Sequence, residues 1–208
     1  MSQIEIYQWL GDHWVELAGS ILGLIYIFLS VRQHILTWPV GLVSSCLYVY
    51  VFFFSKFYAD MGLQVYYVVV SIYGWYFWLK GDKKQNKETA DKEELPVSYT
   101  PRKYWLWLAL IAVGLFIILA FVLKRYTDSP IPLGDSLTTA LSIIATWMLA
   151  RKYIEQWLLW VFIDALSAVF YAVKDLWPTV ILFAVYTVMA VWGYIRWEKD
   201  LKIPRGEE

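Results

Sequence analysis

Seven long apolar stretches follow one another along the chain, and short polar segments separate them. Each comes close to the ~20 apolar residues that a helix needs to cross the hydrocarbon of a bilayer. Lipid offers no partner to backbone N–H and C=O groups, so a helix is the expected state of each stretch. The pattern therefore predicts an all-α polytopic membrane protein with seven transmembrane helices. We expect the spans at 13–31, 35–54, 59–79, 105–123, 134–149, 157–173 and 178–197.

The fifth stretch is the least apolar, because serine and threonine are frequent in it. Within a helix bundle these hydroxyls are expected either to bond back to helix carbonyls or to face a polar cavity. They belong to Ser136, Thr138, Thr139, Ser142 and Thr146.

Composition agrees with a membrane protein. Hydrophobic residues make up 60% of the chain and charged residues 17%, against ~25% charged residues in soluble domains. The formal net charge is zero, which gives no support to nucleic-acid binding. Cys46 is the only cysteine, so neither a disulfide framework nor a cysteine metal site is expected. The first residues lack a basic segment followed by an apolar one, so we expect no cleavable signal peptide.

The basic residues divide unequally between the two ends of the predicted helices. Of the 18 lysines and arginines, four fall on the side of the N-terminus and fourteen on the opposite side, which includes the charged loop 80–103. The excess of basic residues marks the cytoplasmic side. The N-terminus is therefore predicted to lie outside and the C-terminus in the cytoplasm.

The chain resembles itself when it is shifted by 119 residues without gaps. Tryptophan, glycine and arginine seldom coincide by chance at one constant offset, so the match indicates an internal repeat. The shift pairs Arg32 with Arg151, Trp38 with Trp157, Tyr67 with Tyr186, Gly74 with Gly193, Trp78 with Trp197 and Lys80 with Lys199.

The repeat predicts how the chain is organised. Helices one to three form repeat one (1–79), and the charged cytoplasmic loop 80–103 follows. Residues 104–132 hold a linking fourth helix, and 133–208 hold repeat two with the cytoplasmic tail. Because a fourth crossing separates the two sets of three, both repeats enter the membrane from the same side. Such parallel 3+1+3 repeats occur in SWEET-like transporters, whose substrate site lies near mid-membrane between the halves.

Asp164 is the sharpest candidate for a site residue, because a carboxylate near the bilayer centre costs ~2.5–3.5 kcal/mol even on lenient scales. It can balance a cationic substrate in a central cavity. Alternatively, the hydroxyl of Thr138 or Thr139 can hold it as a structural tie.

Aromatic residues make up 19% of the chain, and several flank Asp164. Trp157 and Trp160 are three residues apart and so share a helix face. An aromatic cage attracts cations and stacks planar heterocycles, whereas tryptophans near helix ends also serve as interface anchors. The remaining candidates for the cage are Trp38, Tyr48, Tyr171 and Trp192.

Two glutamines complete the candidate site. The amides of Gln64 and Gln156 can each donate and accept hydrogen bonds at the edge of a heterocycle, or can join two helices. Asp60 and Glu155 stand at predicted helix N-termini, where capping and the helix dipole explain an acidic residue.

No catalytic constellation is visible in the sequence. There is no glycine-rich phosphate loop, no nucleophile with a paired base, and no ligand spacing around His13 or His34. We therefore expect no enzymatic activity, no cofactor and no metal.

Several motifs resemble the PnuC family of bacterial vitamin transporters, and the resemblance covers nearly the whole chain. They are Tyr58-Ala-Asp-Met-Gly-Leu-Gln64, Tyr73-Gly-Trp75, Asp135-Ser136 with Thr138-Thr139, and Ala150-Arg-Lys-Tyr-Ile-Glu-Gln-Trp-Leu-Leu-Trp160. The resemblance implies a multi-pass bacterial inner (plasma) membrane protein that works by facilitated diffusion, with the vitamin trapped by phosphorylation in the cytoplasm. It also implies the 3+1+3 repeat, a substrate among nicotinamide riboside, thiamine and riboflavin, and a homotrimer.

One position bears on the choice of vitamin. Family members that carry nicotinamide riboside tend to have asparagine where this chain has Gln156, whereas Glu155-Gln-Trp157 and Thr127-Asp-Ser-Pro130 are similar to the thiamine (PnuT-like) branch. The sequence comparison favours thiamine, with nicotinamide riboside as the alternative. A SWEET-like sugar facilitator is the alternative from another class.

Overall fold

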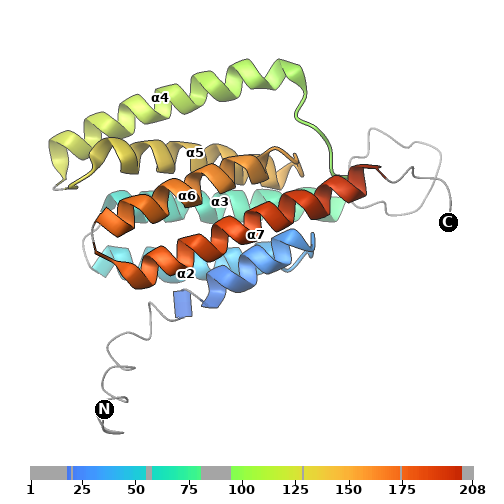
Figure 1. Cartoon of the computed structure of the whole chain (residues 1–208), viewed down its shortest axis with the longest axis horizontal. Helices are drawn as coiled ribbons and strands as arrows, with labels where there is room; N and C mark the ends of the chain where they lie inside the picture. Colours follow the sequence, from blue (N-terminus) through green and yellow to red (C-terminus); the bar gives the residue numbers. More distant parts are fainter. Residues whose placement is uncertain are drawn as a thin grey trace, which may run out of the picture. The chain divides into compact units, whose positions relative to one another are not determined.

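The computed structural model describes residues 18–19, 21–54, 58–80, 95–127, 129–173 and 175–202 (Figure 1). Within these ranges the regular secondary structure is helical, with turns and the non-helical segment 95–101 between helices and an isolated bridge between Ser98 and Tyr153. The helices are Ile21–Val31, α2 Thr37–Phe54, α3 Tyr58–Lys80, α4 Arg102–Tyr126, α5 Pro132–Ala150, α6 Gln156–Val173 and α7 Trp177–Lys202.

Each helix coincides with one of the predicted spans, so the seven-helix, all-α prediction is confirmed. Five of the described helices are long and apolar enough to cross a membrane. α3 is long as well, but its many tyrosines lower its mean hydropathy. Residues 13–17 of the first predicted span lie outside the described residues. α7 runs on to Lys202 because the polar residues after Trp197 continue the same helix.

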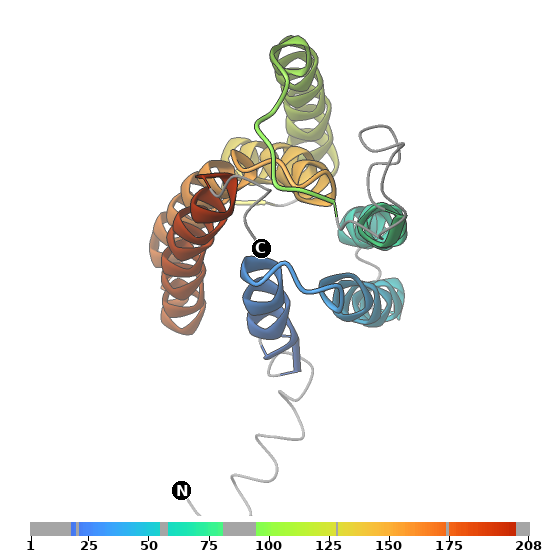
Figure 2. The same ribbon diagram turned by 90° about the vertical axis from the view of Figure 1, so that its right-hand side faces the viewer.

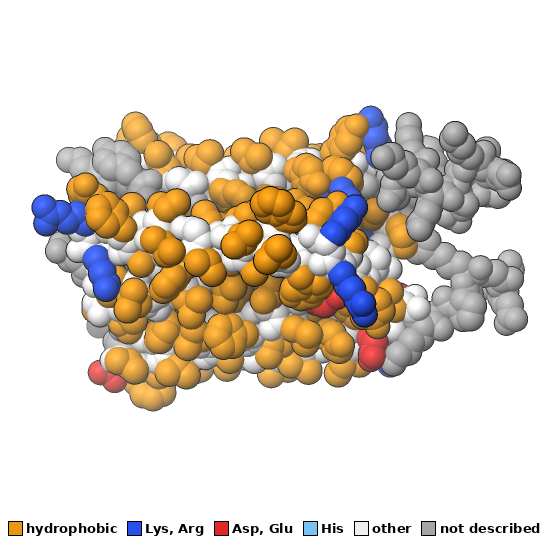
Figure 3. All heavy atoms as spheres, turned by 90° about the horizontal axis from the view of Figure 1, so that it is seen from above, with side chains coloured by type: hydrophobic (Ala, Val, Ile, Leu, Met, Phe, Trp, Pro, Cys, Tyr) orange, Lys and Arg blue, Asp and Glu red, His pale blue; other side chains and the backbone are white. Residues whose placement is uncertain are grey.

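α4 shows how charge is confined to helix ends. Its basic residues are Arg102 and Lys103 at the start and Lys124 and Arg125 at the end, and the residues from 104 to 123 are uncharged. Blue side chains accordingly flank an orange surface along this helix (Figure 3).

The chain divides into two compact units, residues 1–72 and 73–208. In the first unit, Gly41 of α2 brings two other helices close. A Cβ there would lie 2.9 Å from the Tyr26 ring and 3.3 Å from the Ser71 hydroxyl, so glycine permits this contact. Trp38 and Ser45 of α2 are buried in the same unit.

In the second unit, α4 packs on α5, α5 on α6, and α6 most extensively on α7, an order that runs from green to red in Figure 2. α5 is the most buried of these helices. A small apolar cluster joins its C-terminal end to α4 and consists of Leu108, Ile144, Met148 and Tyr153.

Most of the α5 hydroxyls donate hydrogen bonds to carbonyls of their own helix. This is the first of the two alternatives expected from the sequence, the other being that they face a polar cavity. Ser136 donates to the Pro132 carbonyl, Thr138 to the Gly134 carbonyl at 3.1 Å, and Thr146 to the Ser142 carbonyl at 2.7 Å. These bonds satisfy polar groups inside an otherwise apolar environment and allow a serine- and threonine-rich helix to be buried.

Two turns have the same backbone geometry at the predicted offset of 119 residues. Gln33 and Lys152 both have a positive φ, 55° and 53°, which is uncommon for residues other than glycine. The amide of Gln33 donates to Ser30 and that of His34 to Leu29. The amides of Lys152 and Tyr153 donate to Leu149 and Met148, which are the residues 119 positions later in each case.

Gly134, near the start of α5, tests the close packing of the second unit. A Cβ at this position would lie 2.5 Å from the Phe170 ring and 2.8 Å from the side chain of Ile131. We expect Gly134→Ala to lower the free energy of unfolding by about 1–3 kcal/mol through overpacking. Gly114 of α4 has nothing within 4 Å of such a Cβ, so Gly114→Ala is the matched control and should be neutral or slightly stabilising. Thermal unfolding of the detergent-solubilised variants measures both effects, and equal melting temperatures would contradict the packing described.

Candidate functional site

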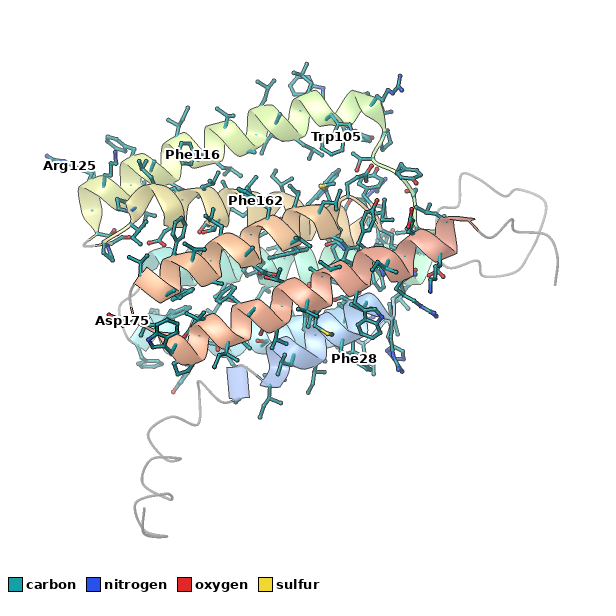
Figure 4. All side chains as sticks on the ribbon, viewed as in Figure 1. Phe28, Trp105, Phe116, Arg125, Phe162 and Asp175 are labelled. Carbon is teal, nitrogen blue, oxygen red and sulfur yellow. The ribbon has the colours of Figure 1, made fainter. Side chains whose placement is uncertain are left out.

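One face of α6 carries a polar and aromatic stripe. Trp160, Asp164, Ser167 and Tyr171 follow one another at intervals of four, three and four residues, which places them on the same side of the helix. Phe162, which Figure 4 labels on α6, is two residues from both Trp160 and Asp164, so helical spacing places it on the opposite side, and it is exposed. Asp164 is the ninth of the 18 residues of α6, so it lies about halfway along a helix of ~27 Å. The stripe therefore runs through the middle of the membrane span.

Asp164 is buried, with 4% of its surface exposed. Among the described residues its carboxylate makes no hydrogen bond or ion pair. The tie to Thr138 gains no support, because the Thr138 hydroxyl donates to the carbonyls of Gly134 and Asp135 at 3.1 and 3.2 Å. A buried carboxylate without a protein partner is suited to pairing with a cationic ligand.

Gln156 begins α6 and is fully buried, at 0% exposure. Neither its amide oxygen nor its amide nitrogen has a hydrogen-bond partner within the described part of the chain. Buried polar groups nearly always have such partners, so this amide is available for a bound molecule or for water. An amide offers donors and an acceptor at once and matches another amide edge to edge.

Thr37 is a further candidate for the site, and the sequence did not single it out. It stands 119 positions before Gln156, is 0% exposed, and its hydroxyl has no partner among the described residues. Each of these two polar side chains directly precedes a buried tryptophan, Trp38 or Trp157. The repeat offset, applied to Gln156, is the signal in the sequence that could have identified Thr37.

Trp157 is held firmly by α7. Its ring meets Trp197 edge to face, with centroids 5.4 Å apart and an angle of 89°. A Cβ at Gly193 would lie 2.7 Å from the indole carbons, so glycine lets the ring rest on the α7 backbone. The indole N–H has no partner among the described residues and is the one polar group that this tryptophan can offer.

The other aromatic candidates have varied environments. Trp160 is half-buried, and Tyr171 stacks on Phe183 at 5.2 Å. Trp192 is 40% exposed and so is not part of the buried set of its unit. In the first unit, Trp38 is buried, Gln64 and Tyr48 are half-buried, and Tyr48 stacks on Phe52 at 5.7 Å. The structure thus gathers Gln156, Trp157, Trp160, Asp164 and Tyr171 along α6.

Glu155 has a different environment from the one expected. Its carboxylate accepts hydrogen bonds from the backbone N–H of Thr100 at 3.0 and 3.1 Å and from the Thr100 hydroxyl at 2.7 Å. The residue does begin a helix, but its side chain joins two segments that are 55 residues apart. Sequence spacing gives no sign of this contact.

Comparison with known proteins gives consistent matches over most of the chain. The family described as nicotinamide mononucleotide transporter matches residues 13–199. The nicotinamide riboside transporter PnuC of Escherichia coli (strain K12) is 29% identical, with 88% of this chain and 84% of that protein covered. The riboflavin/roseoflavin transporter RibM of Streptomyces davaonensis is 28% identical, again with 88% and 84% covered. The crystal structure of the vitamin B3 transporter PnuC superposes with a TM-score of 0.71 at 27% identity, covering 96% of this chain and 87% of that one.

Gly193 provides a test of how Trp157 is placed. We expect Gly193→Ala to displace the indole ring, because the new methyl group needs the space that the ring occupies. The tryptophan near-ultraviolet circular dichroism should change, and the free energy of unfolding should fall by about 1–3 kcal/mol. Gly62→Ala in α3, where nothing lies within 4 Å, is the matched control and should leave the spectrum unchanged. An unaltered spectrum in Gly193→Ala would show that Trp157 is not packed on α7.

Proposed function

Because the chain belongs to the nicotinamide mononucleotide transporter (PnuC) family of vitamin transporters, we propose that it carries nicotinamide riboside by facilitated diffusion. The protein is a multi-pass inner-membrane transporter of a vitamin and not an enzyme. Family membership also removes the reason to consider a sugar as the substrate.

The names of the relatives do not support thiamine and favour the alternative, nicotinamide riboside. Those reported above are transporters of nicotinamide riboside, vitamin B3 and riboflavin, and none is named for thiamine. The preference for thiamine depended on glutamine in place of asparagine at Gln156 and on the similarity of Glu155-Gln-Trp157 and Thr127-Asp-Ser-Pro130 to the thiamine branch. Glutamine and asparagine end in the same amide, so the exchange alters the reach of the group and leaves its hydrogen-bonding chemistry intact.

The chemistry of the α6 stripe supports nicotinamide riboside among the vitamins considered. This molecule is a pyridinium cation with a carboxamide on the ring and hydroxyls on the ribose. The buried Asp164 carboxylate suits the cation and the half-buried Trp160 suits the ring. The Gln156 amide, which has no hydrogen-bond partner among the described residues, suits the carboxamide. Riboflavin carries no positive charge, so it would leave the buried carboxylate without a counterion.

We propose that transport proceeds by rocking of two parallel repeats around this site. The matched turns at Gln33 and Lys152, with the same hydrogen bonds 119 residues apart, support the two repeats. The excess of lysine and arginine supports an outside N-terminus, with the loop 80–103 in the cytoplasm. Phosphorylation of the vitamin in the cytoplasm then makes uptake directional, and the family resemblance leads us to propose a homotrimer as the assembly.

Direct binding measurements test which vitamin is the substrate. Calorimetry on the detergent-solubilised protein should show saturable binding of nicotinamide riboside and weaker binding of thiamine and riboflavin. The discrimination arises because only nicotinamide riboside pairs a cation with a ring carboxamide that can meet the Gln156 amide. Tight binding of thiamine without binding of nicotinamide riboside would overturn the proposed substrate.

The variant Asp164→Asn tests whether the Asp164 carboxylate is the counterion of the bound cation. Removing the carboxylate charge should weaken binding of nicotinamide riboside by about 1–3 kcal/mol, because the ligand cation loses its partner. Calorimetry measures the change. The uncharged dihydro form of the same riboside is the matched ligand control, and its affinity should change little. Asp175→Asn, in the exposed turn between α6 and α7, is the matched variant and should bind like the wild type. Equal losses for both forms of the ligand would show that Asp164 is structural.

A further inference from the structure

The turn between α5 and α6, residues 151–155, is held on one side by the end of α3. The Arg151 guanidinium carbon lies 4.6 Å from the centre of the Phe77 ring, and its Nη1 donates to the Tyr73 hydroxyl at 3.5 Å. Lys152 is 2% exposed, and its Nζ lies 4.5 Å from the centre of the Trp78 ring. Two consecutive cations of the turn thus rest on aromatic rings of a single helix end.

On the other side the turn is held by the strap, which we define as residues 95–100, ahead of α4. The backbone N–H of Ser98 donates to the Lys152 carbonyl at 3.1 Å, and the Ile154 N–H donates to the Ser98 carbonyl at 3.0 Å. Thr100 then reaches the Glu155 carboxylate with its N–H and its hydroxyl. The strap therefore binds both the backbone of the turn and the last side chain before α6.

The bonds to Glu155 are of a strong kind. Hydrogen bonds to a carboxylate are about twice as strong as those between neutral groups, and Thr100 is buried. The Glu155 carbonyl meanwhile accepts from the amides of Leu158 and Leu159 at 3.1 and 3.3 Å. The same residue thus starts α6 with its backbone and is fixed to the strap by its side chain. The strap consequently sets where the first turn of α6 lies.

Gln156 is the next residue, and its buried amide has no hydrogen-bond partner among the described residues. A group that recognises a ligand edge to edge must be held within about 0.5 Å of its productive position. We propose that Glu155 is a positioning residue for the vitamin, which acts by holding the Gln156 amide through its contact with Thr100. This inference rests on the proposed function. It adds that the contact between Thr100 and Glu155 determines how well the protein recognises the carboxamide of the vitamin.

The corresponding turn of the first repeat has no means of making this contact. Leu36 stands 119 residues before Glu155, and its side chain has no hydrogen-bond acceptor. Thr37 stands where the second repeat has Gln156, and its shorter side chain carries one hydroxyl in place of an amide. The strap and its carboxylate partner are therefore specific to the second repeat, the one that carries the longer recognition group and Asp164.

Binding by graded variants tests the inference. Glu155→Gln keeps the shape of the side chain and removes its charge, and Thr100→Val removes only the hydroxyl. Each should raise the Kd for nicotinamide riboside about tenfold through loss of a charge-assisted hydrogen bond. Thr100→Ser retains the hydroxyl and should bind close to the wild type. Asp175→Asn, an exposed carboxylate at the other end of α6, is the matched control and should bind like the wild type.

A second ligand separates positioning from general damage. Pyridinium riboside lacks the carboxamide, so its affinity should be the same in the wild type and in Glu155→Gln. Equal losses for both ligands, or unchanged affinity for nicotinamide riboside in Glu155→Gln and Thr100→Val, would overturn the inference. If Glu155→Gln does not fold, the comparison of Thr100→Val with Thr100→Ser decides the question. A wild type that fails to bind nicotinamide riboside would overturn the proposed function itself, and this inference with it.

Discussion

Hydrocarbon gives a polar group no hydrogen-bond partner, and this constraint governs how polar side chains are placed in the protein. Many hydroxyls within the spans bond to a carbonyl four residues earlier in their own helix. Ser30 donates to Tyr26, Thr146 to Ser142 and Thr187 to Phe183, all at 2.7–2.8 Å. Against this background, buried groups without a protein partner are conspicuous, because each leaves a cost that a ligand or water must offset. Within the part of the chain that the structure describes, the Gln156 amide and the Asp164 carboxylate are of this kind, and both lie on α6.

The constraint relaxes at the helix ends, where the charged residues of the second unit find specific partners. Arg151 and Lys152 rest on aromatic rings of α3, and Glu155 is held by the strap. These contacts position the start of α6, and α6 carries its carboxylate two turns further into the span. A rigid helix therefore connects the charged network at one end with the group that suits a cation near mid-membrane.

Sequence analysis predicted the elements of the fold well but not the partners of individual side chains. All seven helices were expected, since an apolar stretch of about 20 residues has few alternatives in a bilayer. The contact of Trp157 with Gly193 was not expected, although both residues had been noted as members of the internal repeat. Glu155 had a sufficient local explanation as a helix-terminal acid, which hid its contact with Thr100. The preference for thiamine gained no support from the relatives, and at Gln156 it gave an exchange of amide side chains more weight than their shared chemistry supports.

The sequence by itself determined the class of protein, the number and approximate positions of the helices, and the place of Asp164 near the centre of one of them. These follow from local rules, since hydropathy and helical spacing act over a few turns of chain. Only the tertiary structure decided which polar groups are left unpaired. The partner of Thr138 is a carbonyl of its own helix, whereas the partner of Glu155 is a threonine 55 residues away. Whether a buried polar side chain is satisfied depends on every segment that packs around it, and the folded chain is what brings those segments together.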